Sequence, residues 1–310
     1  MLQILEIVLP VFLVIGTGYL AAYFKVFTSE QSNALMRFAT QIAIPCLLFL
    51  AISRLDLKAE FQLGVLAPFF IGALASFTLT SLGAWFFFGH KPGYRIAIGF
   101  AGMFSNLVLI GLSIVELAFG AEALKPAFAI VALHAPFCYV IGITAMEISR
   151  ADGVGFGATV QAVIKQVFSN AITVSLLLGI AANLLNLSPP EAVNTALELI
   201  ARAALPVALF ALGAVLVKYK ISSSLGEISM ISINMLILHP VIAYIVGRYV
   251  FDLSDDLLKV VVLMAAMPPG MNAYAFADLY DRAKGVAASS VMIATALSVV
   301  SISIWLVILS

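Results

Sequence analysis

Two apolar stretches of this chain are interrupted near their middle, and the interruptions fall at matching places in the two halves. The first reads Gly-Phe-Ala-Gly-Met-Phe-Ser-Asn over residues 99–106, and the second reads Met-Pro-Pro-Gly-Met-Asn over residues 267–272. Hydrocarbon offers no water to unpaired backbone groups, so a broken helix at membrane depth persists only inside protein or beside a wet cavity. Paired breaks of this kind typically mark the binding site of a membrane carrier.

The chain is far more apolar than a soluble protein. Of its 310 residues, 63% are hydrophobic and 10% are charged, whereas soluble domains are about half apolar and about a quarter charged. The excess forms runs of about 20 residues, the length that crosses a bilayer. We therefore predict an all-α membrane protein with ten transmembrane helices, near residues 4–24, 34–52, 63–88, 95–118, 126–148, 163–185, 195–217, 228–250, 258–279 and 286–309.

Charge and cysteine content narrow the chemistry further. The formal net charge is zero, which gives no reason to expect a nucleic-acid partner. The two cysteines, Cys46 and Cys138, lie in apolar runs and imply neither a disulfide nor a metal centre. No cofactor motif is present, and we expect no cofactor. The first apolar stretch follows no basic segment, so we expect a retained helix rather than a signal peptide.

A weak internal repeat divides the chain. The segment around Pro45 resembles the segment around Pro206, 161 positions later, and Asn106 corresponds to Asn272 after 166 positions. The alternative is chance similarity between short apolar strings. Five is an odd number of helices, so the second unit would enter from the opposite side and the repeats would be inverted. The predicted parts are a first five-helix repeat at 1–150, a cytoplasmic linker at 151–162 and a second, inverted five-helix repeat at 163–310.

Basic residues indicate the orientation. The side reached after the odd-numbered spans carries ten of the sixteen Lys and Arg residues, and the other side carries five. Because basic residues concentrate on the cytoplasmic side, we expect both termini on the non-cytoplasmic side of a cell (inner or plasma) membrane.

The pattern resembles the auxin efflux carrier family, which includes bacterial malonate and malate carriers and plant PIN-type auxin exporters. The most specific likeness is the segment 264–274, and the helices with Pro45 and Pro206 also match. The resemblance implies an NhaA-like or bile-acid-carrier-like fold in which broken helices 4 and 9 cross at mid-membrane. It also implies a scaffold of helices 1, 2, 6 and 7, a transport unit of helices 3–5 and 8–10, and a homodimer formed through the scaffold.

The fourth helix departs from the family pattern, which often reads Asn-Thr-Gly-x-x-Gly-x-Pro. Asn106 and Gly111 are retained, but Leu107 and Val108 follow the asparagine and Ser113 stands at the proline position. We therefore expect a milder first break with a thinner polar lining, and the identity of the substrate stays open.

Each broken helix is expected to expose the N-terminus of its second half near the midplane. Free N–H groups and the positive end of the helix dipole favour an anion there. Asn106 and Asn272 would add amide donors, although the alternative for Asn106 is a cap or helix-gluing residue. The predicted substrate-binding residues are Asn106, Asn272, Ser105, Tyr274, Gly111 and Gly270. The predicted helix-breaking residues, which lack a backbone donor, are Pro268, Pro269, Pro45 and Pro206.

Ionisable residues inside spans are candidates for ion coupling. His134 and His239 each precede a proline by one or two positions. Either imidazole is a candidate for proton coupling, and the alternative is that each bonds a carbonyl freed by that proline. Arg202 is expected to attract anions or to pair with Glu198 one turn earlier, and we favour the pair.

The leading hypothesis is a secondary transporter that moves a small organic anion, a mono- or dicarboxylate such as malonate or malate, by elevator-type alternating access with proton linkage. One alternative is a sodium-coupled organic-anion symporter similar to bile-acid carriers, and another is a non-transporting membrane sensor. Hard cations prefer carboxylate ligands, and no Asp or Glu adjoins either break, which favours an anion over sodium. No catalytic motif is present, so we do not expect an enzyme.

Overall fold

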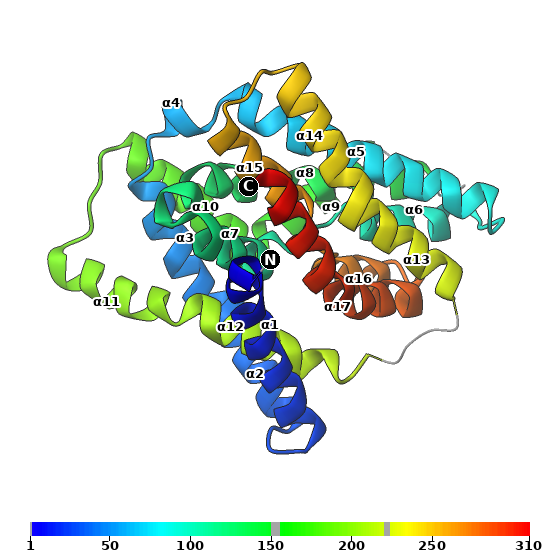
Figure 1. The fold of residues 1–310 in the computed structure, drawn as a ribbon, viewed down its shortest axis with the longest axis horizontal. Helices are drawn as coiled ribbons and strands as arrows, with labels where there is room; N and C mark the ends of the chain where they lie inside the picture. The colour runs from blue at the N-terminus through cyan, green and yellow to red at the C-terminus, as the bar shows by residue number, and fades with distance from the viewer. Residues whose placement is uncertain (1, 150–155, 220–223) are drawn as a thin grey trace.

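The computed structural model describes residues 2–149, 156–219 and 224–310 (Figure 1). Within these ranges every regular element is a helix, and the only extended pairing is an isolated antiparallel bridge between Ser105 and Pro269. The α-helices are α1 (Leu2–Tyr23), α2 (Ser29–Phe38), α3 (Ile44–Ser53), α4 (Leu57–Glu60), α5 (Leu63–Phe86), α6 (Pro92–Ala101), α7 (Leu112–Phe119), α8 (Leu124–Ile148), α9 (Phe156–Phe168), α10 (Ala171–Leu184), α11 (Glu191–Arg202), α12 (Ala204–Leu216), α13 (Leu225–Ile233), α14 (His239–Tyr249), α15 (Asp255–Ala265), α16 (Met271–Leu279) and α17 (Lys284–Leu309). Wider, π-helical turns are η1 (Ala39–Ala43), η2 (Leu107–Gly111) and η4 (Asn234–Leu238), and η3 (Ala121–Ala123) is a short 3-10 turn.

Several of these helices are long and apolar enough to cross a membrane. In the described part of the chain there are seven, or eight if one bent pair counts as a single span. They are Glu6–Tyr23, Ser29–Ser53, Leu63–Phe86, Ala121–Ile148, Glu191–Leu216, Leu225–Tyr249 and Lys284–Leu309, with Gly157–Phe168 and Ala171–Leu184 as the bent pair. The predicted fourth and ninth spans are each divided into shorter helices.

The sixth predicted span, 163–185, differs from a straight rod. Its two helices, α9 and α10, meet at 81° around Ser169 and Asn170. Residues 151–155 of the predicted linker lie outside the described residues, and residues 156–162 belong to α9. The predicted linker is therefore helical in its described part.

Two of the predicted helix-breaking prolines lie within spans that continue past them. Pro45 opens α3 directly after the π-helical turn η1, and the span 29–53 continues through it. A wider turn accommodates a proline because it relieves the clash between the ring and the preceding carbonyl groups. Pro206 lies in the first turn of α12, just after the single non-helical residue Ala203. We predicted both as helix-breaking residues, but neither ends the membrane-length helix in which it lies.

The helices pack in two groups (Figure 1). In the first group, α1 runs along α12, and α3 packs on α10 and α11. In the second, α5 packs on α6, α14 and α15, and α17 packs on α13 and α16. We call these the α1–α12 group and the α5–α17 group. The α1–α12 contact is close because a Cβ atom on Gly18 or Gly213 would overlap the backbone of the facing helix, at Phe210 or Ile15 respectively.

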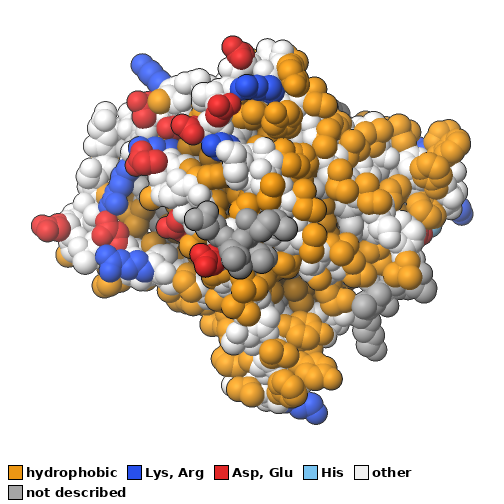
Figure 2. Space-filling view, viewed as in Figure 1, with side chains coloured by type: hydrophobic (Ala, Val, Ile, Leu, Met, Phe, Trp, Pro, Cys, Tyr) orange, Lys and Arg blue, Asp and Glu red, His pale blue; other side chains and the backbone are white. Residues whose placement is uncertain are grey.

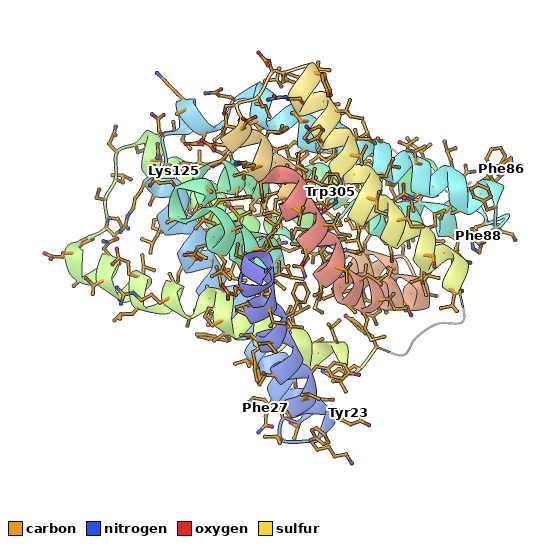
Figure 3. All side chains as sticks on the ribbon, in the orientation of Figure 1. Tyr23, Phe27, Phe86, Phe88, Lys125 and Trp305 are labelled. Atoms are coloured by element: carbon orange, nitrogen blue, oxygen red, sulfur yellow. The ribbon has the colours of Figure 1, made fainter. Side chains whose placement is uncertain are left out.

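The surface matches a lipid environment. Hydrophobic side chains cover most of the face in Figure 2, and charged side chains gather towards its upper left. Ile148, Phe86 and Leu63 leave 81%, 78% and 72% of their surface exposed, which water would penalise. Figure 3 shows aromatic side chains at helix ends, with Tyr23 and Phe27 where α1 joins α2 and Phe86 at the end of α5. Aromatic residues at such positions are typical of the membrane interface.

Candidate functional site

The two broken helices meet and pair with each other. The Asn106 N–H donates to the Pro268 carbonyl at 2.8 Å, and the Gly270 N–H donates to the Phe104 carbonyl at 2.7 Å. These reciprocal bonds form the Ser105–Pro269 bridge. They satisfy backbone groups that each interrupted helix leaves free, which hydrocarbon could not do. We call this junction the crossover.

The crossover requires close backbone approach. A Cβ atom on Gly270 would lie 3.3 Å from the Ser105 carbonyl oxygen and 3.4 Å from the Cα of Asn106. Pro268 and Pro269 occupy the break between α15 and α16 and have no N–H to leave unpaired. The first break, residues 102–106, is as long as the second, residues 266–270, although Ser113 replaces the family's proline. The expected milder first break is therefore not observed, because partner backbone rather than proline holds it open.

His134 supports the crossover from α8. The Ser105 N–H donates to its Nε2 at 3.3 Å, and its ring packs edge-on against Phe104 with 4.6 Å between ring centroids. His239 lies behind it, fully buried, and its Nε2 donates to the Phe69 carbonyl at 3.1 Å. Both imidazoles thus contact backbone groups of other helices, rather than carbonyls freed by their neighbouring prolines.

A cavity of about 690 Å³ opens against the crossover. We call it the crossover cavity. Ser105, Asn106, Gly270 and Asn272 all line it, and so does His134. Four of the six predicted substrate-binding residues therefore share one cavity, together with one of the two histidines.

The remaining two predicted substrate-binding residues lie elsewhere. Tyr274 does not line the crossover cavity, and its ring faces Tyr219 with 5.2 Å between centroids. Gly111 packs under Met264 and Met267, where an added Cβ would come within 3.1 Å and 3.3 Å of their side chains. Tyr274 is displaced because it lies two positions past Asn272 on α16, where a helix has turned by more than half a revolution.

The cavity also has walls that the sequence did not indicate. They come from α2 and η1, from α8, and from the bend between α9 and α10. The residues involved are Met36, Thr40, Gln41, Tyr139, Gln166, Ser169 and Asn170. The one available sequence signal was Ser169-Asn170, a capping pair inside an otherwise apolar span.

Two polar groups at the crossover are poised to bind a ligand. Asn106 is 5% exposed and Ser105 is 2% exposed, and both line the cavity. Neither the Asn106 Nδ2 nor the Ser105 Oγ has a hydrogen-bond partner. An unpaired buried polar group costs about 1–3 kcal/mol, so a bound acceptor would stabilise both. The helix starts at Leu107 and Met271 add partial positive charge at the same place.

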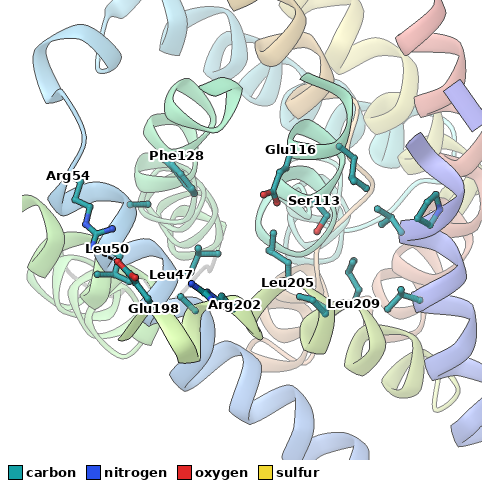
Figure 4. Close-up of a pocket in the computed structure, with 17 residues that line it drawn as sticks. Leu47, Leu50, Arg54, Ser113, Glu116, Phe128, Glu198, Arg202, Leu205 and Leu209 are labelled. Carbon is teal, nitrogen blue, oxygen red and sulfur yellow. Dashed lines mark hydrogen bonds and ion pairs between the residues drawn. The ribbon is translucent and has the colours of Figure 1, made fainter. Parts of the chain in front are cut away.

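A second cavity, of about 760 Å³, is lined by residues of α3 and α7, the helices that follow η1 and η2 along the chain (Figure 4). We call it the arginine cavity, because Arg54 and Arg202 line it together with Glu116 and Glu198. Arg54 donates to Glu198 at 2.8 Å and to Asn194 at 2.6 Å. The predicted Arg202–Glu198 pair is therefore wrong, because α3 brings a better-placed guanidinium to the same carboxylate.

A thin packed layer separates the two cavities. Along η1 and α3, Gln41 lines the crossover cavity and Leu47 lines the arginine cavity, with fully buried Ile44 between them. Along η2 and α7, Leu109 and Ser113 line the two cavities in the same order. The same two helices thus form walls of both cavities.

The chain is similar to known proteins along nearly its whole length. A family model described as "Membrane transport protein" matches residues 3–306. A "Putative malonate transporter" of Rhizobium meliloti (strain 1021) is 25% identical over 303 residues, which cover 98% of this chain and 95% of the relative. An "Uncharacterized transporter" of Methanothermobacter thermautotrophicus is 26% identical over 307 residues, which cover 98% of both chains.

Proposed function

Because the chain belongs to the membrane transport protein family, the auxin efflux carriers, we propose that it is a secondary transporter that moves a small carboxylate through the crossover cavity. The resemblance read from its residues is confirmed, and the chain is a multi-pass membrane transporter and not an enzyme. The observation that carries the proposal is the unpartnered Asn106 amide at the meeting point of two helix starts.

The chemistry of the cavity favours an anion. Its described lining residues offer amides, hydroxyls and helix N-termini, and none of them is Asp or Glu. Sodium is a hard cation that takes oxygen ligands, usually with carboxylates among them. This argues against a sodium-coupled symporter as the alternative. A small carboxylate fits the donors best, and the name of the Rhizobium relative refers to malonate, one such compound.

The paired cavities support alternating access. An elevator-type movement of the α5–α17 group against the α1–α12 group would carry the crossover past the packed layer at Ile44, towards the arginine cavity. In this proposal the first group is the scaffold, helices 1, 2, 6 and 7. The second group is the transport unit, helices 3–5 and 8–10.

The same proposal includes ten spans in two inverted repeats. The seven long helices and the bent pair would account for eight of them. The divided pairs α6 with α7, and α15 with α16, would be the fourth and ninth. We further propose that both termini lie outside the inner or plasma membrane, as the distribution of basic residues suggests.

We also propose proton linkage and a homodimer. His134 is the side-chain candidate for the proton because it lines the cavity, whereas His239 does not. The dimer would form through the α1–α12 group, where Gly16 has no other atom near its added Cβ position. The molecular mass of the detergent-solubilised protein, measured by light scattering, tests the dimer.

Transport itself is tested in liposomes. The purified protein should take up labelled malonate or malate under an imposed pH gradient. Asn106→Ala and Asn272→Ala should each reduce uptake about tenfold or more, because each removes a donor to a charged group. Asn234→Ala is the matched control, since Asn234 is a buried asparagine of η4 that does not line the cavity. Absence of carboxylate flux, or parent-like uptake by both crossover variants, would refute the proposal.

A further inference from the structure

The bend between α9 and α10 forms a third helix start beside the crossover. The Asn170 side chain accepts the Ile172 N–H at 3.0 Å and so caps α10, a helix of 14 residues. The Ser169 hydroxyl donates back to the Gln166 carbonyl at 3.1 Å and closes the end of α9. We call residues 166–172 the elbow.

The elbow and the crossover face one cavity. Gln166, Ser169 and Asn170 line it together with Asn106 and Asn272. Tyr139 of α8 lines the same cavity. The ligand itself is indicated independently, by the buried and unpartnered Asn106 Nδ2 and Ser105 Oγ. The site therefore has two polar ends, contributed by different helices.

The two ends differ in hydrogen-bond chemistry. At the crossover the free group of Asn106 is an amide donor, which suits an ionised carboxylate. At the elbow the Gln166 amide carries both donor and acceptor atoms, and the capped turn adds a hydroxyl. An acceptor at the elbow suits a group that still carries a hydrogen.

The charges around the cavity limit the net negative charge that a bound ligand can carry. No Asp, Glu, Lys or Arg is among its described lining residues, and His134 and Tyr139 are the titratable groups there. The neighbouring Arg37 and Lys165 are exposed and do not line the cavity. Helix starts supply only about half a charge each, so a second full negative charge would be poorly compensated.

We propose that the crossover cavity binds a dicarboxylate in its monoprotonated form, with the carboxylate at the crossover and the carboxylic acid at the elbow. This rests on the carboxylate transport proposed above. The proton then travels on the substrate, so one proton and one net negative charge cross together. The proton then need not pass through His134, the side-chain candidate named above, whose Nε2 accepts the Ser105 N–H.

The pH dependence of exchange tests this proposal. Malonate exchange is measured in liposomes with equal pH on both sides, so that no gradient drives it. Above the second dissociation of malonate, the apparent Km for total malonate should rise about tenfold per pH unit, following the loss of the monoprotonated species. Monomethyl malonate, which keeps one charge and a neutral second end, should inhibit exchange equally at every pH.

Other results separate the two proposals. A pH-independent Km for malonate, or failure of the ester to compete, would overturn the monoprotonated ligand while leaving carboxylate transport intact. Ester inhibition that weakens with rising pH in parallel with malonate would place the titrating group on the protein, and would also overturn it. Exchange of no carboxylate at any pH would instead refute the transport function.

The elbow is tested by substitution. Gln166→Leu should weaken the binding of malonate and of monomethyl malonate about tenfold, which is the effect of one lost hydrogen bond. Competition by acetate should stay unchanged, because acetate has no second carboxyl group. Gln161→Leu is the matched control, because Gln161 is an exposed residue of the same helix and does not line the cavity. Equal losses for acetate and malonate would contradict a role for the elbow in recognising the second end.

Discussion

At the residue scale, the two backbones of the crossover can come into contact because Gly270 has no side chain. Gly270 allows its N–H to reach the Phe104 carbonyl at 2.7 Å, and Asn106 is thereby held with its amide unpaired at the cavity wall. If the proposed carboxylate binds there, the free energy that the unpaired amide costs the empty protein would contribute to binding.

Gly270→Ala should therefore impair both stability and transport. The added methyl group would press on Ser105 and Asn106 at 3.3–3.4 Å, and overpacking of this kind costs about 1–3 kcal/mol. A thermal-shift assay in detergent should show a lower melting temperature, and uptake should fall. Gly64→Ala is the control, because its Cβ would meet only side chains at 3.7 Å or more. A melting temperature equal to that of the parent would show that the crossover tolerates wider separation than the structure implies.

At the element scale, close backbone packing joins two helices of the α1–α12 group. α1 and α12 touch backbone to backbone through Gly18 and Gly213. Small residues at such interfaces are the usual basis of tight association in membranes, where no hydrophobic effect drives helices together. This contact would make the α1–α12 group a rigid frame, as the scaffold of the proposed mechanism requires.

Gly213→Ala should loosen that frame. Its Cβ would overlap the Ile15 carbonyl, so α1 and α12 must separate. We expect a lower melting temperature by the same assay, with a loss of about 1–3 kcal/mol. Gly157→Ala, in α9 and facing open space at its added Cβ, should leave the melting temperature unchanged or raise it. Equal behaviour of the two variants would argue against close α1–α12 packing.

At the scale of the whole molecule, two cavities share walls but are divided by one packed layer. The crossover cavity and the arginine cavity lie in succession along η1–α3 and along η2–α7. Under the proposed alternating access, each cavity would open to one side of the membrane, with the packed layer between them.

Cysteine accessibility tests this division. In a background with Cys46→Ala and Cys138→Ala, Thr40→Cys should react with a membrane-impermeant thiol reagent from one side, and Leu50→Cys from the other. Thr40 lines the crossover cavity and Leu50 lines the arginine cavity. Ile71→Cys on the exposed face of α5 should react from neither side, because lipid covers it. Labelling of Thr40→Cys and Leu50→Cys from the same side would refute two-sided access.

A structural feature of this protein could be predicted from the sequence where it depends only on residues a few positions apart. The amino-acid sequence alone determined the helical membrane class, the two broken spans and the position of Asn106 and Asn272 beside the breaks, because apolar run length and helix-breaking residues act within a few positions. The same local reasoning overestimated how strongly Pro45 and Pro206 would disrupt their helices. One wider turn accommodates Pro45, and one non-helical residue precedes the helix that contains Pro206.

Only the tertiary structure decided which side chains meet in the cavity. It turned Tyr274 and Gly111 away, paired Glu198 with Arg54 of a distant helix, placed the His134 ring against the Ser105 N–H, and brought the elbow to the crossover. Each of these depends on how helices far apart in the chain are rotated and tilted against one another. Periodicity along a single helix carries no information about that, since rotation and tilt are set by packing between helices.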